Sequence, residues 1–138
     1  TEDSRKLFLR KNLYKYAPII KDAFESIRTL VKNDFDVEFL TVRNEKLTDT
    51  TFEWLNNHGL SIDTWFFTGG DQKIKYIREN HFDIIVEDNL DYLRELNGSV
   101  FFLYLIDYPY NQNSPRGITR VSGWTEIIED MRLWGFIK

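Results

Sequence analysis

Several side chains that can bind phosphate or a divalent cation directly follow strand-like segments of this sequence. Thr41 lies near the end of the segment VEFLTVR, Lys73 comes shortly after TWFFTGG, and Glu87 and Asp88 close the segment FDIIVED. Two adjacent carboxylates can hold a hard cation such as Mg²⁺ through oxygen ligands. A lysine and a hydroxyl can neutralise and orient the non-bridging oxygens of a phosphoryl group. If these residues meet in space, the chemistry they suit is phosphoryl transfer.

Each of these residues also has an ordinary structural interpretation. A threonine at a strand end is commonly structural, and Glu87-Asp88 can serve to cap a helix that begins near Asn89. Lys73 is more informative, because a cation in the first turn of a helix is mildly disfavoured by the helix dipole. A solvated lysine remains its ordinary alternative, so the argument depends on the residues occurring together on one edge.

An alternation of helix and strand patterns must position these residues. Apolar residues at helical spacing predict a helix near 19–33, with Pro18 in its first turn. Strands are expected at 37–43, 64–67, 82–87, 99–106 and 118–121. Further helices are expected from about Thr48 to Gly59, in the segment that follows a capping Asp71, over Leu90–Leu96, and over 124–134. This order predicts an α/β fold with three layers, a parallel sheet covered by helices on both faces. Ligands of such sheets bind beyond the carboxyl ends of the strands.

Composition narrows the class of protein. The 138 residues suit one domain, and 42% hydrophobic residues suffice for a core. A net charge of −4 without a long basic run argues against a nucleic-acid polymer as partner. The absence of cysteine excludes disulfides and Cys-based zinc sites. No run of apolar residues is long enough to span a membrane and no signal peptide is evident, so we expect a cytoplasmic protein. Because the sequence starts with Thr1 and not with Met, we also expect a processed or trimmed product.

Five segments in order resemble the haloacid-dehalogenase-like (HAD-like) phosphatases, and more narrowly the small bacterial 5'-nucleotidases related to 5'(3')-deoxyribonucleotidases. The segments are FLTVRN, followed by LTDTTFEWL, then GGDQK, DIIVEDN, LIDYPYNQ and RVSGWTEI. The resemblance implies a Rossmannoid fold and roles for six residues: phosphate binding by Thr41 and Lys73, substrate contacts from Val42 and Arg43, and Mg²⁺ ligation by Glu87 and Asp88. It also implies that the loop Tyr108–Asn111 lies near the site.

The sequence departs from this family at its start. The family begins with a strand that ends in Asp-x-Asp, whose first aspartate is the nucleophile, and residues 1–16 contain no such strand. We interpret 1–16 as a remnant of the small cap segment, and 17–138 as a core that lacks its first strand and is therefore incomplete at the N-terminus. Asp34-Phe35-Asp36 precedes its strand, so it is expected at the opposite edge of the sheet as a solvated turn.

The missing strand would lie between the strands that end at Thr41 and Glu87. An unfilled place there would leave unpaired backbone and a gap in the core, both costly. Three alternatives stay open: an amino-terminal segment of a longer protein, a strand from a second chain, or Leu7–Leu9 in a rearranged fold. The first is the preferred interpretation.

The leading functional hypothesis is a Mg²⁺-dependent phosphomonoester hydrolase, a nucleotidase acting on a small phosphorylated substrate through an aspartyl-phosphate. Because the attacking aspartate is missing from this chain, the chain by itself is not expected to turn over substrate. The alternative is a catalytically inactive HAD-like binding or regulatory module. A receiver-like domain fits the alternation but needs a phosphoacceptor aspartate at a central strand end, and the strand ending at Thr41 offers none.

Overall fold

The structure, a computed structural model, describes residues 5–9, 17–42 and 63–138. Its six strands form one sheet in the order β3-β2-β1-β4-β5-β6, and every neighbouring pair is parallel. The strands are β1 (Arg5–Leu9), β2 (Phe35–Val42), β3 (Asp63–Phe67), β4 (Ile84–Glu87), β5 (Phe102–Ile106) and β6 (Thr119–Val121). The helices are α1 (Ala17–Lys32), α3 (Gly70–Glu79), α4 (Leu90–Leu96) and α5 (Trp124–Leu133).

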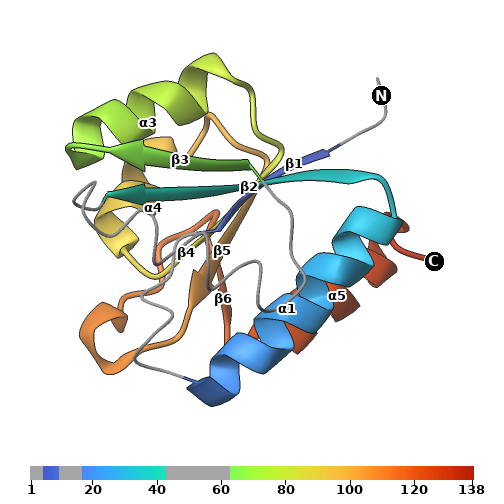
Figure 1. Ribbon diagram of the computed structural model, residues 1–138. Coiled ribbons are helices and arrows are strands. Elements are labelled where there is room, and N and C mark those ends of the chain that lie inside the picture. The colour runs from blue at the N-terminus through green and yellow to red at the C-terminus, as the bar shows by residue number, and fades with distance from the viewer. Residues whose placement is uncertain (1–4, 10–16, 43–62) are drawn as a thin grey trace.

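The helices cover the sheet on both faces, as the alternating pattern predicts. Figure 1 shows α1 and α5 side by side on one face and α3 and α4 on the other. Two buried clusters fill the space between the layers, one around Phe39 and Trp124 and the other around Leu40 and Leu93. Phe39 and Leu40 are neighbours in β2 and enter different clusters because successive side chains of a strand point to opposite faces. The fold is thus a three-layer Rossmannoid α/β fold.

The expected elements match the described ones closely. The helix expected near 19–33 is α1, and the last helix, expected at 124–134, is α5. Asp71 does not cap α3: the N-cap is Gly69 in an extended conformation, and Asp71 lies within the first turn. Asp34 adopts a left-handed turn with φ 65° at the amino end of β2, the edge where it was expected. The expectation of a solvated turn is wrong for Phe35 and Asp36, because both belong to β2 and pair with β1, and Phe35 is buried. The helix expected from Thr48 to Gly59 lies outside the described residues.

Residues of this chain occupy the place between β2 and β4. Strand β1 pairs with both neighbours, and Leu7 lies opposite Val37 on one side and Ile84 on the other. The described sheet is therefore continuous from β3 to β6, and its β1 comes from the segment 1–16 that we interpreted as a cap remnant. Of the three alternatives for this place, the structure has the third, in which Leu7–Leu9 fill it. The preferred alternative, a preceding segment of a longer protein, stays a prediction.

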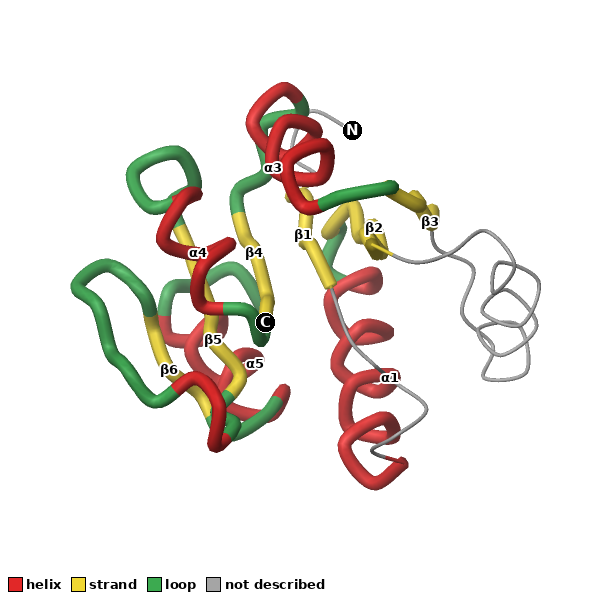
Figure 2. Tube along the Cα trace, turned by 90° about the vertical axis from the view of Figure 1, so that its left-hand side faces the viewer, coloured by secondary structure: helices red, strands yellow, loops and turns green. Residues whose placement is uncertain are grey.

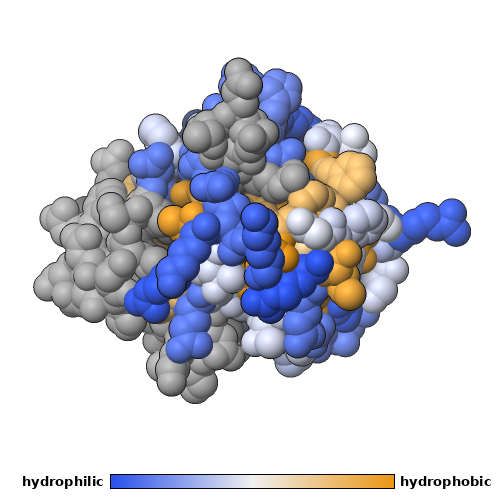
Figure 3. All heavy atoms as spheres, turned by 90° about the vertical axis from the view of Figure 1, so that its right-hand side faces the viewer, coloured by the Kyte–Doolittle hydropathy of each residue, from blue (hydrophilic) through white to orange (hydrophobic). Residues whose placement is uncertain are grey.

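The amino ends of the strands form a second, partly apolar edge. There Phe102 packs against Phe101, Trp134 and Phe136, with ring centroids 4.8 to 5.6 Å apart. Figure 3 views this side of the molecule and shows apolar atoms among hydrophilic side chains. No helix in the described part of the chain combines the length and the apolar character needed to cross a membrane.

Candidate functional site

The strand order itself marks one position at the carboxyl edge. From β1 the chain builds outward in one direction through β2 and β3, and from β4 in the other through β5 and β6. In open α/β sheets, ligands bind at such a switch point, outside the carboxyl ends of the two strands where the order reverses. Figure 2, seen from the side to which β2 and β3 point in Figure 1, shows β1 and β4 next to each other. The residues that follow β4 therefore lie at the expected ligand position.

Lys73 and Glu87 meet at this position. The Nζ of Lys73, in the first turn of α3, lies 2.8 Å from Oε2 of Glu87, the last residue of β4. Both side chains are fully buried. The same ammonium lies 4.6 Å from the centroid of the Tyr92 ring, within cation–π range. A lysine and a carboxylate taken so far out of water must be paired, because an isolated buried charge is very costly.

Glu87 also ties the end of β4 to the start of α4. Its Oε1 accepts hydrogen bonds from the backbone N–H groups of Asp88 and Asn89, each at 3.0 Å. Asn89 in turn is the N-cap of α4, and its Oδ1 accepts from the N–H groups of Asp91 and Tyr92. Both oxygens of Glu87 thus have protein partners. The carboxylate thus links the end of β4 to both α3 and α4.

Asp88 has a different environment from its neighbour. Its side chain is half-buried, and its Oδ2 accepts a hydrogen bond of 2.6 Å from the hydroxyl of Tyr110. Its backbone carbonyl accepts one from Nδ2 of Asn111 at 2.8 Å. The two adjacent acids therefore diverge: Glu87 is enclosed with Lys73, and Asp88 lies at the edge beside the loop that follows β5.

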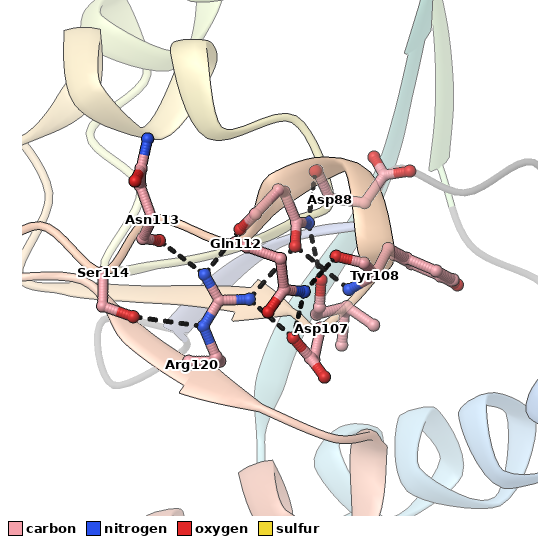
Figure 4. Close-up of polar contacts among 9 residues, drawn as sticks. Asp88, Asp107, Tyr108, Gln112, Asn113, Ser114 and Arg120 are labelled. Atoms are coloured by element: carbon pink, nitrogen blue, oxygen red, sulfur yellow. Dashed lines mark hydrogen bonds and ion pairs between the residues drawn. The ribbon is translucent and has the colours of Figure 1, made fainter.

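Arg120, in β6, holds this loop in place (Figure 4). Its guanidinium pairs with Asp107 at 2.7 Å and donates to the side chain and the backbone carbonyl of Asn111. It also donates to the Asn113 carbonyl and the Ser114 hydroxyl. A planar guanidinium with five fixed donors suits such a cluster of acceptors, which an ammonium could not satisfy in the same way. Through Asn111, this network fixes the backbone of Asp88.

An open pocket of about 510 Å³ adjoins Asp88. Its lining combines residues of α4 with residues of the loop after β5: Asp88, Asn89, Leu90, Asp91, Arg94, Tyr110, Asn111 and Asn113. Most of these side chains are polar, and the pocket opens at the carboxyl edge of the sheet. Its size is within the range of small-molecule sites.

Thr41, Val42 and Arg43 were expected at the same edge. Thr41 and Val42 are the last two residues of β2, where they pair with Phe66 and Phe67 of β3. Because the strands are parallel, these backbone positions lie at the carboxyl edge, with β1 between β2 and β4. The side chain of Thr41 and the whole of Arg43 lie outside the described residues. Their predicted contacts with phosphate stay predictions.

Of the two predicted Mg²⁺ ligands, Asp88 is the one that lies at the edge of the sheet. Among the described residues there is no group of three or more His, Cys, Asp or Glu side chains that could hold a metal. Mg²⁺ commonly needs only one or two carboxylates, because water and substrate phosphate complete its shell. Asp88, at the edge, suits that role. Glu87 has both oxygens engaged and pairs with Lys73, so its predicted role as a second Mg²⁺ ligand stays a prediction.

Sequence reasoning did not single out Arg120 or Tyr92. Arg120 stands in the segment RVSGWTEI, and Tyr92 in the helix expected over Leu90–Leu96. Their partners are 6 to 19 residues away along the chain, since Arg120 contacts 107–114 and Tyr92 contacts Lys73. The only sequence signal was an arginine in a short strand that follows a polar loop, which is common on protein surfaces.

Fold and site together define a Rossmannoid α/β protein with a polar, charge-paired centre at its switch point. No family model matches the chain. A nucleotidase of Clostridium acetobutylicum is 30% identical over 116 residues, which are 83% of this chain and 60% of that protein. YqfW of Bacillus subtilis, named as a candidate nucleotidase, is 28% identical over 86% of this chain and 62% of its own length. Another candidate nucleotidase, of Bacillus cereus, is 28% identical over 76% of this chain and 56% of its own length.

The chain is therefore similar, over most of its length, to bacterial proteins named as nucleotidases. It spans about three fifths of the length of these curated relatives.

Proposed function

We propose that the protein containing these residues is a Mg²⁺-dependent phosphomonoester hydrolase that acts on nucleotides. The observation that carries the proposal is the buried Lys73–Glu87 pair with Asp88 beside it, at the carboxyl end of β4 and at the switch point. The similarity to proteins named as nucleotidases supports a nucleotide as the substrate. HAD-like membership of the chain, suggested by its motifs, is part of the same proposal.

In the proposed reaction, an aspartate from outside these 138 residues attacks phosphorus. The ester bond breaks, the nucleoside leaves with its oxygen, and water then hydrolyses the aspartyl-phosphate to inorganic phosphate. Thr41 and Lys73 orient the phosphate oxygens, and Val42 and Arg43 contact the substrate. Glu87 pairs with Lys73 and keeps it in place, and Asp88 would hold the cation. Bound Mg²⁺ would offset the charge that develops on the phosphoryl oxygens.

Phosphate release tests this proposal. Deoxynucleoside monophosphates are incubated with Mg²⁺ and either the 138-residue chain or a version extended at its start by the upstream coding sequence. We expect release by the extended version and none by the chain alone, since only the extended version would supply the nucleophile. Release by neither version would contradict the enzyme proposal.

Asp88→Asn in the active version tests the role of the outward acid. It should lower the rate by at least about a hundredfold, because a metal ligand stabilises transition-state charge. The matched control is Asp83→Asn, an exposed aspartate directly before β4, at the opposite end of the same strand. The control should leave the rate unchanged. Equal rates for both variants would contradict the proposed role of Asp88 as a metal ligand.

A second candidate is a catalytically inactive binding or regulatory module. It is favoured by one observation: β1, built from Arg5–Leu9, completes the sheet without any segment that carries an aspartate. On this alternative, the natural protein binds nucleotide without releasing phosphate. Calorimetric binding of a deoxynucleoside monophosphate by the extended version, without phosphate release by that version, would favour it.

A further inference from the structure

Tyr110 is exposed, yet its ring is held in a fixed orientation. The residue is 65% exposed. Its ring is stacked on that of Tyr108, with centroids 5.3 Å apart and planes 6° from parallel. Its hydroxyl donates to Oδ2 of Asp88 at 2.6 Å. An exposed aromatic side chain usually gains little from being ordered in this way, because immobilising it costs conformational entropy.

The loop beneath Tyr110 is rigid for reasons that do not involve Tyr110. Tyr108 is only 9% exposed, and its backbone N–H donates to Oδ1 of Asn111 at 3.0 Å. Asn111 is held by Arg120, as described above. A surface that is already ordered before a ligand arrives loses less entropy on binding. Tyr110 therefore has the properties of a preformed contact surface.

The surroundings of Tyr110 fit the non-phosphate part of a nucleotide. Tyr110 forms one wall of the 510 Å³ pocket beside Asp88. Asn89, Asp91 and Asn113 add amide and carboxylate groups, which can donate to or accept from base edges and sugar hydroxyls. Leu90 adds an apolar contact. A molecule whose phosphate lies at Asp88 could extend into this pocket.

We propose that Tyr110 is the stacking surface for the nucleobase of the substrate, and that the pocket between α4 and the loop after β5 receives the nucleoside. This inference rests on the proposed function, which places the phosphate beside Lys73 and Asp88. Stacking on an aromatic ring tolerates every base, because each has a π-face. The site therefore selects nucleotides over phosphosugars without strong preference among bases.

Calorimetric binding tests the inference. Deoxyadenosine 5'-monophosphate and deoxyribose 5-phosphate are compared on the 138-residue chain with Mg²⁺ and on the extended version without Mg²⁺, so that neither protein is expected to turn over its ligand. The original protein should bind the nucleotide more tightly. Tyr110→Ala should reduce the ratio of the two affinities about tenfold, the loss expected for one stacked base. Tyr110→Phe, which keeps the ring and loses only the hydroxyl, should retain the ratio within about twofold.

Phe101→Ala is the control for removing an exposed ring. Phe101 is 78% exposed and lies just before β5, at the amino edge of the sheet. It should leave both affinities unchanged. If Tyr110→Ala leaves the affinity ratio unchanged while both ligands still bind, the stacking inference is overturned and the phosphate site stands. If neither ligand binds to either version of the original protein, the proposed function fails, and this inference with it.

Discussion

At the scale of single residues, Lys73 and Glu87 form an ion pair that is costly to bury. Both side chains are fully buried, and their charges lie 2.8 Å apart. Their mutual attraction offsets two large desolvation costs, so such a pair adds little net stability but is expensive to break. Because such a pair adds little net stability, its place at the switch point fits the phosphate-binding role that we propose for Lys73.

Removing one partner of this pair should strongly destabilise the protein. Glu87→Gln leaves a buried ammonium without its counter-charge, and we expect the free energy of unfolding to fall by about 3–5 kcal/mol. Lys73→Met should have a similar effect. The double variant Lys73→Met/Glu87→Gln carries no buried charge and should be more stable than either single variant. Urea unfolding measures all three. Losses below about 0.5 kcal/mol in both single variants would contradict the burial of the pair.

The stability of the protein at high pH should depend on Tyr104. Burial, and a hydrogen bond of 2.5 Å to Asp130, raise the pKa of Tyr104 well above its ordinary value of 10.0. Above pH 10 an unfolded tyrosine loses its proton while the folded one keeps it, so the folded state binds more protons and stability falls as pH rises. Below pH 10 the contribution is fully present.

Urea unfolding between pH 9 and pH 11.5 tests this dependence. Tyr104 should contribute up to about 1.4 kcal/mol per pH unit to the decline. Tyr104→Phe should flatten the decline by that amount while costing about 1 kcal/mol at neutral pH for the lost hydrogen bond. Burial and a hydrogen bond to Glu38 also raise the pKa of Tyr76. Stability should therefore still decline with pH in Tyr104→Phe, but less steeply than in the original protein. If Tyr104→Phe loses stability with pH as steeply as the original protein, Tyr104 ionises as readily in the folded state as in the unfolded state.

At the scale of the elements, the start of α3 positions the candidate site. The helix begins directly after β3 and Gly69, and this short connection places Lys73 one turn beyond the sheet edge. Gly70 lets α4 approach closely, because a Cβ there would lie 2.6 Å from the Tyr92 hydroxyl oxygen and 2.7 Å from a ring carbon. The lack of a side chain at Gly70 thus permits the contact between Tyr92 and Lys73.

Gly70→Ala should therefore disturb the site. Tyr92 would have to move, and we expect a loss of about 1–3 kcal/mol in the free energy of unfolding from overpacking. Gly69→Ala is the matched control, since a Cβ there meets nothing within 4 Å and the backbone is extended. It should cost less than about 1 kcal/mol, through a poorer cap. Thermal unfolding of the two variants makes the comparison, and equal losses would contradict the close packing at Gly70.

At the scale of the whole molecule, the sheet depends on its central strand. Strand β1 forms backbone pairs on both sides, with β2 and with β4. Without it the two halves of the sheet, and the two buried clusters that span them, would lose their connection. We therefore expect folding to require whichever segment occupies this place.

A proline in β1 tests which segment that is. Leu7→Pro removes a ladder donor in a central strand and should abolish cooperative urea unfolding of the 138-residue chain. The same substitution in the version extended by the upstream coding sequence discriminates between the alternatives. If a preceding segment takes the central place there, the variant should unfold like its parent. If Leu7→Pro leaves the 138-residue chain unaffected, β1 does not hold the sheet together.

The order and type of the elements could be predicted from the sequence, because they depend on short-range patterns. Helical spacing after Pro18 predicted α1, and the apolar run before Asp107 predicted β5. Alternation of these patterns then predicted a parallel sheet. The carboxyl-edge rule predicted that Glu87 and Asp88 follow a strand at that edge and that Lys73 lies nearby.

Only the tertiary structure decided how those residues face one another. Whether Glu87 or Asp88 lies inward depends on where Lys73 and the backbone N–H groups of α4 stand, and the sequence treats the two acids alike. The contact of Arg120 with the loop after β5, and the pairing of Arg5–Leu9 with two distant strands, join segments that no local pattern connects. Local periodicity fixes which face of an element is apolar, whereas long-range pairing depends on packing and hydrogen bonding across the whole molecule.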